Sequence, residues 1–224
     1  LQNDPRSKPK RIAMPSNGIE TFYDIEQGSE QWRAIRCGLP TASEFSSILA
    51  KGEGKTRRSY MLKLAGEVLT GVPADGFESA DTIRGHEMEP AARTLYAFMT
   101  DTEPQLVGFV RNGKKGCSPD AMIGNDGLLE IKTKKPALLI DVLLKGDFPP
   151  EHKAQCQGAL WVAEREWIDL AVYWPGLPLF ITRATRDEQY IKALSNAVDA
   201  FNDELESVVN SIRTYQDFGR QAAA

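Results

Sequence analysis

The sequence contains little of the two residue types that most often bind zinc or form covalent cross-links. Its 224 residues include two histidines and three cysteines. The cysteines, Cys37, Cys117 and Cys156, are odd in number and show no C-x-x-C spacing, so neither a disulfide framework nor a thiolate metal site is indicated. His86 precedes a glutamate, but position 90 is proline, so the second histidine of an H-E-x-x-H zinc motif is missing. We expect free thiols and a cytoplasmic setting.

The sequence also lacks long apolar runs and an excess of basic residues. No apolar stretch approaches the roughly 18 residues that span a bilayer, and no apolar signal region opens the chain. Lys and Arg number 27 against 31 Asp and Glu, which gives a net charge of −4. This balance argues against a protein that coats nucleic acid by bulk attraction. It is compatible with an enzyme that concentrates its basic side chains along one channel.

The length suits a single domain with a full core. Residues 1–17 are polar, basic and interrupted by three prolines, so we expect a flexible N-terminal segment there, with Met14 a candidate natural start. We expect one domain over residues 18–220.

The spacing of apolar residues changes along this domain and predicts its elements. Helical spacing predicts helices over residues 29–38, 41–50, 57–70, 80–100, 137–146, 151–164 and 187–215. Short segments with strand-like residues predict an antiparallel meander over 105–112, 114–124 and 127–133, and a further strand pair over 167–174 and 178–185. The predicted fold class is α/β or α+β, with a central mixed β-sheet flanked by helices.

The segment from Asp120 to Lys132 is the richest in chemistry. Glu130 and Lys132 are two apart on a predicted strand, so both project from the same face. A hairpin that turns at residues 124–127 with a three-residue loop would place Asp120 opposite Lys132, with Glu130 diagonal to it. Two carboxylates and an ammonium group on one face suit phosphodiester hydrolysis, because carboxylate oxygens bind Mg²⁺ or Mn²⁺ and Lys132 can position a water. The alternative is an exposed hairpin with a surface ion pair.

Arg36 and Ser43 suggest a second site. Thr41 and Glu44 have the spacing of a capping box, and a helix that begins at Thr41 would direct free N–H groups outward. With the Arg36 guanidinium and the Ser43 hydroxyl beside it, that end would form an anion pocket. The alternative is that Thr41 and Glu44 merely cap a helix and Arg36 is exposed.

Six motifs, taken together and in order, resemble those of nucleases with a PD-(D/E)xK core, and within them the phage lambda exonuclease family with its YqaJ-like recombinase relatives. The motifs are Arg36-Cys37-Gly38, Thr41-Ala42-Ser43-Glu44, Ala92-Arg93-Thr94-Leu95 after Glu89, Cys117-Ser118-Pro119-Asp120, Glu130-Ile131-Lys132 and Ala154-Gln155-Cys156-Gln157. They span residues 30–165.

The resemblance implies a role for each residue. It implies that Asp120, Glu130 and the Ile131 backbone carbonyl bind Mg²⁺, with Mn²⁺ as substitute, and that Lys132 orients the attacking water. Glu89 resembles the acidic residue that the preceding helix supplies to the family's active site. The alternative is that Glu89 is a solvated carboxylate on a helix surface. Gln157 is similar to the glutamine that follows the core, although a helix-surface amide is the alternative. Where a relative places a phosphate-binding arginine, this chain has Leu138. Lys134 or Lys135 could take over the role of that arginine.

The resemblance further implies an activity and partners. It implies that Arg36, Ser43 and Ser118 bind the 5′-phosphate, and that a homotrimeric ring digests one strand of linear double-stranded DNA processively from 5′ to 3′. The 3′ overhang would then serve recombination with a single-strand annealing protein. A site- or structure-specific endonuclease on the same core is an alternative, as is a DNA-binding module without activity.

Overall fold

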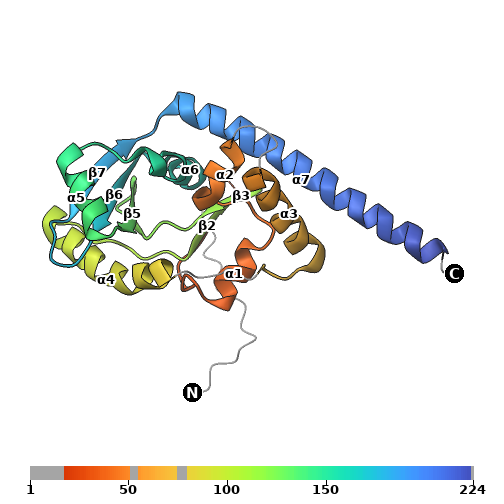
Figure 1. The fold of residues 1–224 in the computed structure, drawn as a ribbon, viewed down its shortest axis with the longest axis horizontal. Coiled ribbons are helices and arrows are strands. Elements are labelled where there is room, and N and C mark those ends of the chain that lie inside the picture. Colours follow the sequence, from red (N-terminus) through yellow and green to blue (C-terminus); the bar gives the residue numbers. More distant parts are fainter. Residues whose placement is uncertain (1–17, 51–54, 75–79, 223–224) are drawn as a thin grey trace, which may run out of the picture.

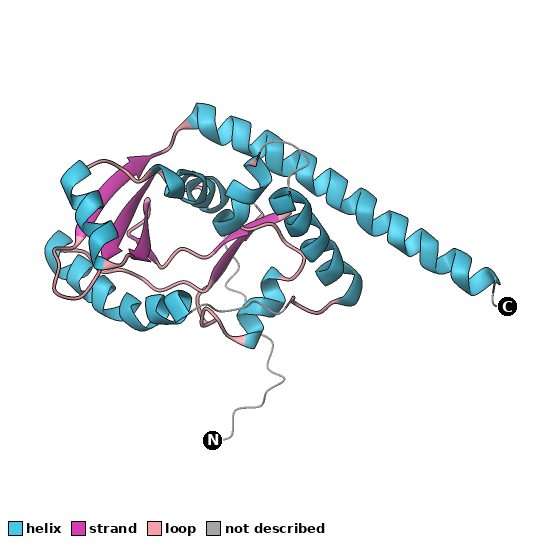
Figure 2. Cartoon of the chain, viewed as in Figure 1, coloured by secondary structure: helices cyan, strands magenta, loops and turns pink. Residues whose placement is uncertain are grey.

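The computed structural model of the chain describes residues 18–50, 55–74 and 80–222. The flexible segment predicted over residues 1–17 lies outside these ranges. Within them, helices surround two small sheets in a mixed α/β fold (Figures 1 and 2), which confirms the predicted fold class. No helix in the described ranges combines the length with the apolar character that a membrane span needs.

The elements match the predicted ones closely in position. The strands are β1 (Ile19–Phe22), β2 (Phe109–Asn112), β3 (Lys115–Cys117), β4 (Ala121–Ile123), β5 (Gly127–Thr133), β6 (Trp167–Tyr173) and β7 (Phe180–Thr185). The helices are α1 (Glu30–Arg36), α2 (Phe45–Leu49), α3 (Lys55–Thr70), α4 (Ala80–Thr100), α5 (Pro136–Lys145), α6 (Lys153–Ala163) and α7 (Glu188–Ala222), with two 3-10 turns, η1 (Ala42–Glu44) and η2 (Pro150–His152). Strand β1 was not predicted.

The strands form two separate sheets rather than one meander. Strands β1, β2 and β3 pair antiparallel. Strands β4 to β7 form a mixed sheet in which β5 and β6 run parallel and the outer pairs antiparallel. The predicted meander is wrong because the chain passes from one sheet to the other between β3 and β4. Pro119, which has no N–H to donate to a strand, lies in that link, so Ser118 and Asp120 stand at the junction of the sheets.

Strand β5 is covered on both faces. Leu128 packs in one apolar cluster with residues of α6, and Leu129 and Ile131 pack in another with Ala92 and Tyr96 of α4. The connection to the parallel strand β6 runs through α5 and α6, as a parallel pair requires. Gly127 starts β5 against the Trp167 ring, where an added Cβ would lie 2.3 Å from a ring carbon. Burial on both faces explains why β5 is mostly apolar and why its charged residues stand out.

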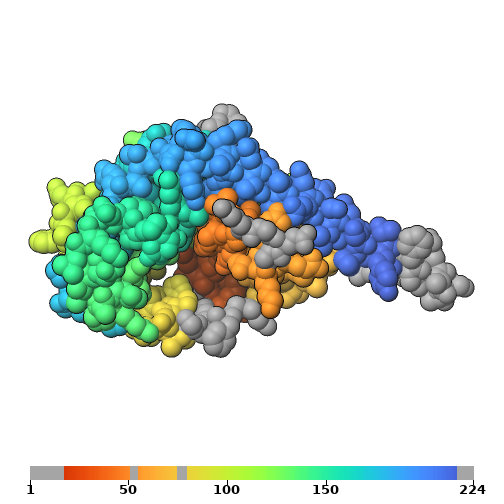
Figure 3. Space-filling view, turned by 45° about the horizontal axis from the view of Figure 1, so that its top comes forward, coloured from red at the N-terminus to blue at the C-terminus, as the bar shows by residue number. Residues whose placement is uncertain are grey.

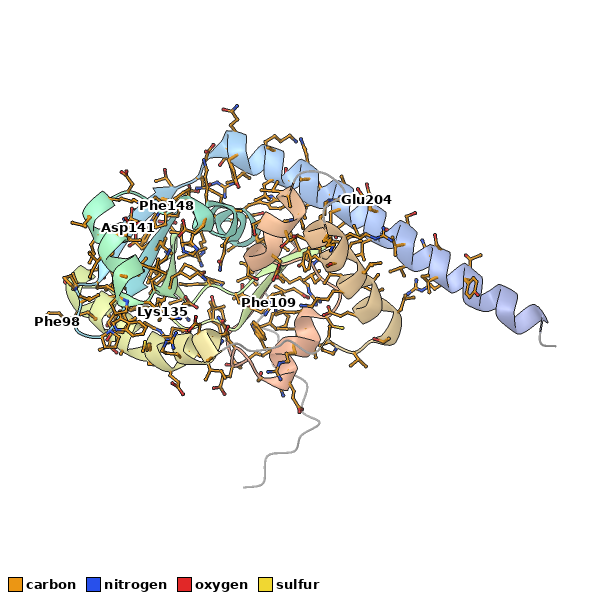
Figure 4. The ribbon with its side chains drawn as sticks, viewed as in Figure 1. Phe98, Phe109, Lys135, Asp141, Phe148 and Glu204 are labelled. Carbon is orange, nitrogen blue, oxygen red and sulfur yellow. The ribbon has the colours of Figure 1, made fainter. Side chains whose placement is uncertain are left out.

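The long helix α7 packs along the N-terminal helices and then projects beyond the body (Figure 1). Phe201 stacks on Tyr60 of α3 with ring centroids 5.6 Å apart. Glu204, labelled in Figure 4, forms an ion pair of 2.8 Å with Arg57 of α3. These contacts attach α7 to the half of the molecule that carries Arg36 and Ser43.

The predicted capping box at Thr41 is wrong. A 3-10 turn, η1, follows Thr41, and α2 then contains five residues. The Thr41 hydroxyl makes no capping hydrogen bond; instead it accepts one from Arg36 Nη2 at 3.2 Å. An anion pocket here therefore depends on side chains and not on a helix end.

Candidate active site

A cavity of about 300 Å³ lies at the junction of the two sheets. Residues from α1, η1, the start of α4, the β3–β4 link, β5 and α6 line it: Gln27, Trp32, Arg36, Ala42, Ser43, Thr82, His86, Cys117, Ser118, Pro119, Asp120, Glu130, Lys132, Gln155 and Ala159. In the space-filling view a hollow lies between the N-terminal elements, α4 and the green segment that includes α5 (Figure 3). The two groups of residues predicted from sequence thus meet in one cavity.

The β4–β5 hairpin brings Asp120 and Glu130 together. Ala121 pairs with Leu129, so Asp120 aligns with Glu130 and not with Lys132 as predicted. The turn is one residue earlier than that register required, because Gly127 already belongs to β5. A shift of two positions keeps every side chain on its face, and the Asp120 N–H donates to the Leu129 carbonyl at 3.0 Å. The predicted cluster therefore forms despite the wrong register.

Glu130 is the centre of a short hydrogen-bonded group. Its side chain is 5% exposed, and its Oε1 accepts from Lys132 Nζ at 2.7 Å. The same oxygen accepts from Gln155 Nε2 at 2.5 Å. Because both donors act on Oε1, neither occupies Oε2.

Gln157 does not belong to this group, contrary to the sequence prediction. Its Nε2 donates to the Thr185 carbonyl at 2.8 Å, and its Oε1 accepts from the Asp187 N–H at 2.8 Å. Two positions along a helix turn a side chain by about 200°, so Gln155 and Gln157 point to opposite sides of α6. Gln155, and not the predicted Gln157, therefore contacts Glu130.

Asp120 and Lys132 have perturbed pKa values for related reasons. Burial raises the pKa of the Asp120 carboxyl well above its ordinary value, and the charges of Glu130 and Glu89 raise it further. Its Oδ2 accepts a hydrogen bond of 2.5 Å from the Ile131 N–H, which opposes the shift. Burial lowers the pKa of Lys132, but the two carboxylates outweigh it and the pKa is raised. The site therefore has more negative charge than Lys132 alone balances.

Glu89 of α4 approaches Asp120 from an adjoining cavity. That cavity, of about 590 Å³, is lined by Glu89, Asp120 and His86 among others. Glu89 accepts from Arg93 Nη2 at 2.7 Å, and His86 Nδ1 lies 3.9 Å from its other oxygen. Glu89 thus contributes charge to the site while its carboxylate is held by its own helix.

The donor set fits a divalent cation. Asp120 and Glu130 present hard oxygen ligands side by side, and the raised pKa of Asp120 reflects negative charge that a cation would offset. Within the described ranges, no group of three or more His, Cys, Asp or Glu side chains is placed to hold a metal ion. A bound Mg²⁺ would accordingly rely on these two carboxylates, a backbone carbonyl such as that of Ile131, and water.

Arg36 dominates the other end of the cavity. Burial lowers its pKa, and among the described residues no carboxylate lies within 4.0 Å of its guanidinium. Thr41 Oγ1 lies 3.3 Å from Ser43 Oγ, and Ser118 lines the same cavity. Arg36 is half-buried, and Glu67 and Glu44 act on its charge only from a longer distance. A guanidinium with nearby hydroxyls and no ion-pair partner among the described residues suits a phosphate group.

The two lysines considered as substitutes for a phosphate-binding arginine both form ion pairs. Lys134 pairs with Glu151, and Lys135 pairs with Asp81 at the start of α4 at 3.2 Å. Figure 4 labels Lys135. Leu138 is 57% exposed, and none of the three lines the cavity. A DNA phosphate that binds either lysine would therefore share the ammonium group with a carboxylate.

Comparison with known proteins identifies relatives. The family model described as the YqaJ-like viral recombinase domain matches residues 31–166. The alkaline exonuclease LHK-Exo from Laribacter hongkongensis is 31% identical, with a TM-score of 0.77 over 84% of this chain and 98% of that one. Its complex with dAMP gives a TM-score of 0.79 at the same identity and coverage. A phage-related exonuclease from Haemophilus somnus 129PT has the same fold at 15% identity, with a TM-score of 0.56 over 78% of this chain and 96% of that one. No curated protein sequence matches significantly.

Proposed function

Since this chain belongs to the family of YqaJ-like viral recombinase domains, we propose that it is a Mg²⁺-dependent exonuclease that digests one strand of linear duplex DNA from its 5′ end. It is homologous to alkaline exonucleases, which hydrolyse phosphodiester bonds. The role in recombination and the processive digestion from 5′ to 3′ are parts of the proposal that go beyond this homology. The product would be a duplex with a 3′ single-stranded overhang.

One observation carries the proposal: the carboxylates of Asp120 and Glu130 and the half-buried guanidinium of Arg36 line a single cavity of about 300 Å³. Ser118 belongs to the anion end and Asp120 to the carboxylate end, and one residue separates them. A strand whose terminal phosphate is bound at Arg36 therefore has only its outermost bonds near Asp120 and Glu130. That geometry favours cleavage at an end over cleavage within a strand.

The residues of the cluster have complementary roles. Asp120, Glu130 and the Ile131 carbonyl would hold Mg²⁺, which when bound polarises a phosphoryl oxygen and acidifies water. Lys132, held by Glu130 at 2.7 Å, would position the water and neutralise charge that develops on the phosphate. Gln155 holds the orientation of Glu130, and Glu89 adds negative charge beside Asp120. Gln157 has no part in this chemistry.

The 5′-phosphate would bind Arg36, Ser43 and Ser118. A half-buried guanidinium ion without a paired carboxylate gains a charge-assisted hydrogen bond when a phosphate enters. We expect Arg36→Ala to lower the ratio of rates on 5′-phosphorylated and 5′-hydroxyl duplexes. An unchanged ratio would remove Arg36 from the proposed receptor.

The proposal includes the assembly and setting expected of this family. A homotrimeric ring around the duplex would explain processive digestion, and a single-strand annealing protein would take up the overhang. The free thiols of Cys37, Cys117 and Cys156 suit the cytoplasm. Mass measurement in solution tests the ring: a value near three chains supports it, and a monomer contradicts it.

The central experiment compares linear and closed circular duplexes. With Mg²⁺, the protein should degrade 5′-phosphorylated linear DNA from one end of each strand and leave the intact circle unchanged. Asp120→Asn is the inactive control. Nicking or linearisation of the circle by the active protein, but not by the control, would replace the exonuclease by an endonuclease on the same core. Failure to hydrolyse any DNA with Mg²⁺ or Mn²⁺ would favour a binding module.

A further inference from the structure

Trp32 of α1 contacts two of the residues proposed to bind the 5′-phosphate, Arg36 and Ser118. Its ring lies against the Arg36 guanidinium, with 3.7 Å between the guanidinium carbon and the ring centroid. Its indole N–H donates to Ser118 Oγ at 3.0 Å and to the Gly108 carbonyl at 3.1 Å. One side chain therefore connects α1 with the β3–β4 link, two segments more than 80 residues apart in sequence.

The contact with Ser118 determines how its hydroxyl is used. An indole N–H is only a donor, so Ser118 Oγ must act as the acceptor. The hydroxyl of serine has a single proton, and Trp32 leaves that proton free to donate elsewhere. Since Ser118 lines the cavity, an anion inside can receive it.

The contact with Arg36 fixes the plane of the guanidinium. A guanidinium that stacks on an aromatic face keeps its in-plane N–H groups at the edge. One of them, on Nη2, donates to Thr41 Oγ1 at 3.2 Å. Stacking thus holds Arg36 in the cavity without an ion-pair partner among the described residues, since Glu67 and Glu44 act on it only from a longer distance.

We propose that Trp32 is the positioning residue of a receptor for a terminal phosphate monoester. Its ring orients the Arg36 guanidinium, and its N–H donates to Ser118 Oγ, so that the Ser118 hydroxyl proton is directed to the phosphate. This inference rests on the proposed function and deepens it, because it assigns the preference for 5′-phosphorylated ends to a residue that has no charge. Trp32 acts through Arg36 and Ser118.

Two substitutions separate the two contacts. Trp32→Phe keeps an aromatic ring under Arg36 but removes the N–H, whereas Trp32→Leu removes both. Trp174→Phe is the matched control, because Trp174 also packs beneath an arginine, Arg84, at 5.3 Å but does not line the cavity. Melting temperatures of all variants establish that each is folded.

The measurement is the ratio of affinities for 5′-phosphorylated and 5′-hydroxyl duplexes, by fluorescence anisotropy in EDTA, beside the ratio of kcat/KM values with Mg²⁺. We expect Trp32→Leu to reduce both ratios about tenfold, the equivalent of about 1.4 kcal/mol, and Trp32→Phe to reduce them less. The ratio carries the test, because a general loss of structure would lower the affinities for both duplexes together and leave their ratio unchanged.

The outcomes distinguish the two levels of the proposal. If Arg36→Ala removes the preference while folded Trp32→Phe and Trp32→Leu retain it, the role of Trp32 is refuted and the receptor stands. If Arg36→Ala also leaves the ratio unchanged, the receptor itself is refuted. A loss of preference in Trp174→Phe as well would assign the effect to general packing and overturn the inference.

Discussion

Replacing Asp120 by asparagine should stabilise the metal-free protein while abolishing its activity. Burial and the charges of Glu130 and Glu89 raise the pKa of the Asp120 carboxyl. Asparagine has a similar shape, keeps an oxygen that can accept the Ile131 N–H, and has no charge. The substitution therefore removes repulsion between carboxylates and preserves the packing.

The sign and size of the effect follow from the direction of that shift. When folding raises the pKa of an acid, its contribution to stability is complete below the unfolded value, near 4, and is lost as pH rises through the folded value. The gain from Asp120→Asn should therefore vanish near pH 4 and increase as the pH rises above that value. One unit of pKa corresponds to about 1.4 kcal/mol, and in a chain of this length about 1 kcal/mol shifts Tm by about 2–4 °C. We expect an increase of about 3 °C or more.

The assay is thermal unfolding in EDTA at pH 4 and pH 7.5, repeated at pH 7.5 with Mg²⁺. Added Mg²⁺ should raise the Tm of the wild-type protein and leave the variant unchanged, because a cation that binds only the folded state stabilises it. Asp126→Asn is the control, since Asp126 is exposed in the hairpin turn, and it should have no effect. A lower Tm for Asp120→Asn than for the wild type in EDTA at pH 7.5 would refute the reasoning.

Three further predictions test the surroundings of the site. Gln155→Ala should lower kcat with little change in Tm. Gln157→Ala breaks two hydrogen bonds to the backbone, so it should lower the free energy of unfolding by about 2–3 kcal/mol and leave the kcat of the folded enzyme unchanged. The reverse pattern in paired assays would contradict the assignment of Gln155. Gly158→Ala should destabilise the protein by about 1–2 kcal/mol, because its Cβ would lie 2.4 Å from Phe45 Cδ2. Gly66→Ala in α3, where an added Cβ would have no atom within 4 Å, should stabilise the protein. Equal shifts of the urea midpoint in the two variants would disprove this. Burial and the charges of Lys132 and Lys134 lower the pKa of His152 to about 4. The stability of the protein should therefore fall as the pH drops from about 6.5 to about 4, and His152→Gln should flatten that part of the plot of Tm against pH. An unaltered plot would exclude His152 as the cause.

The sequence was sufficient for much of the fold because its periodicities are local. Helices α3 to α6 and strands β5 to β7 agree with the predicted ranges within two residues, and α7 begins where predicted but ends at Ala222 instead of near Tyr215. Apolar spacing and terminal residues such as Gly146, which ends α5 in a left-handed conformation, encode these elements directly. Strand β1 was missed because four half-buried residues give no clear alternation. The break between the sheets was also missed, because pairing between distant strands is not a local property.

The candidate site shows the same division. Alternation along β5 predicted that Glu130 and Lys132 share a face, and that remains true although the hairpin register differs by two residues. The choice between Gln155 and Gln157 depended on how α6 is rotated against β5, which no spacing of two residues can settle. The Thr41 prediction failed because the threonine hydroxyl is engaged by Arg36, a tertiary contact that competes with capping.

For the proposed exonuclease, the link between the two sheets has a consequence for the length of each step along DNA. Ser118 and Asp120 lie on one short stretch of backbone, and two residues span at most about 7 Å. If Ser118 binds the terminal phosphate and Asp120 a metal ion, as proposed, the distance between the bound end and the cleaved bond would be limited by this stretch of backbone. Motion of the surrounding helices can widen or narrow the entrance of the cavity, but it cannot lengthen the backbone between Ser118 and Asp120.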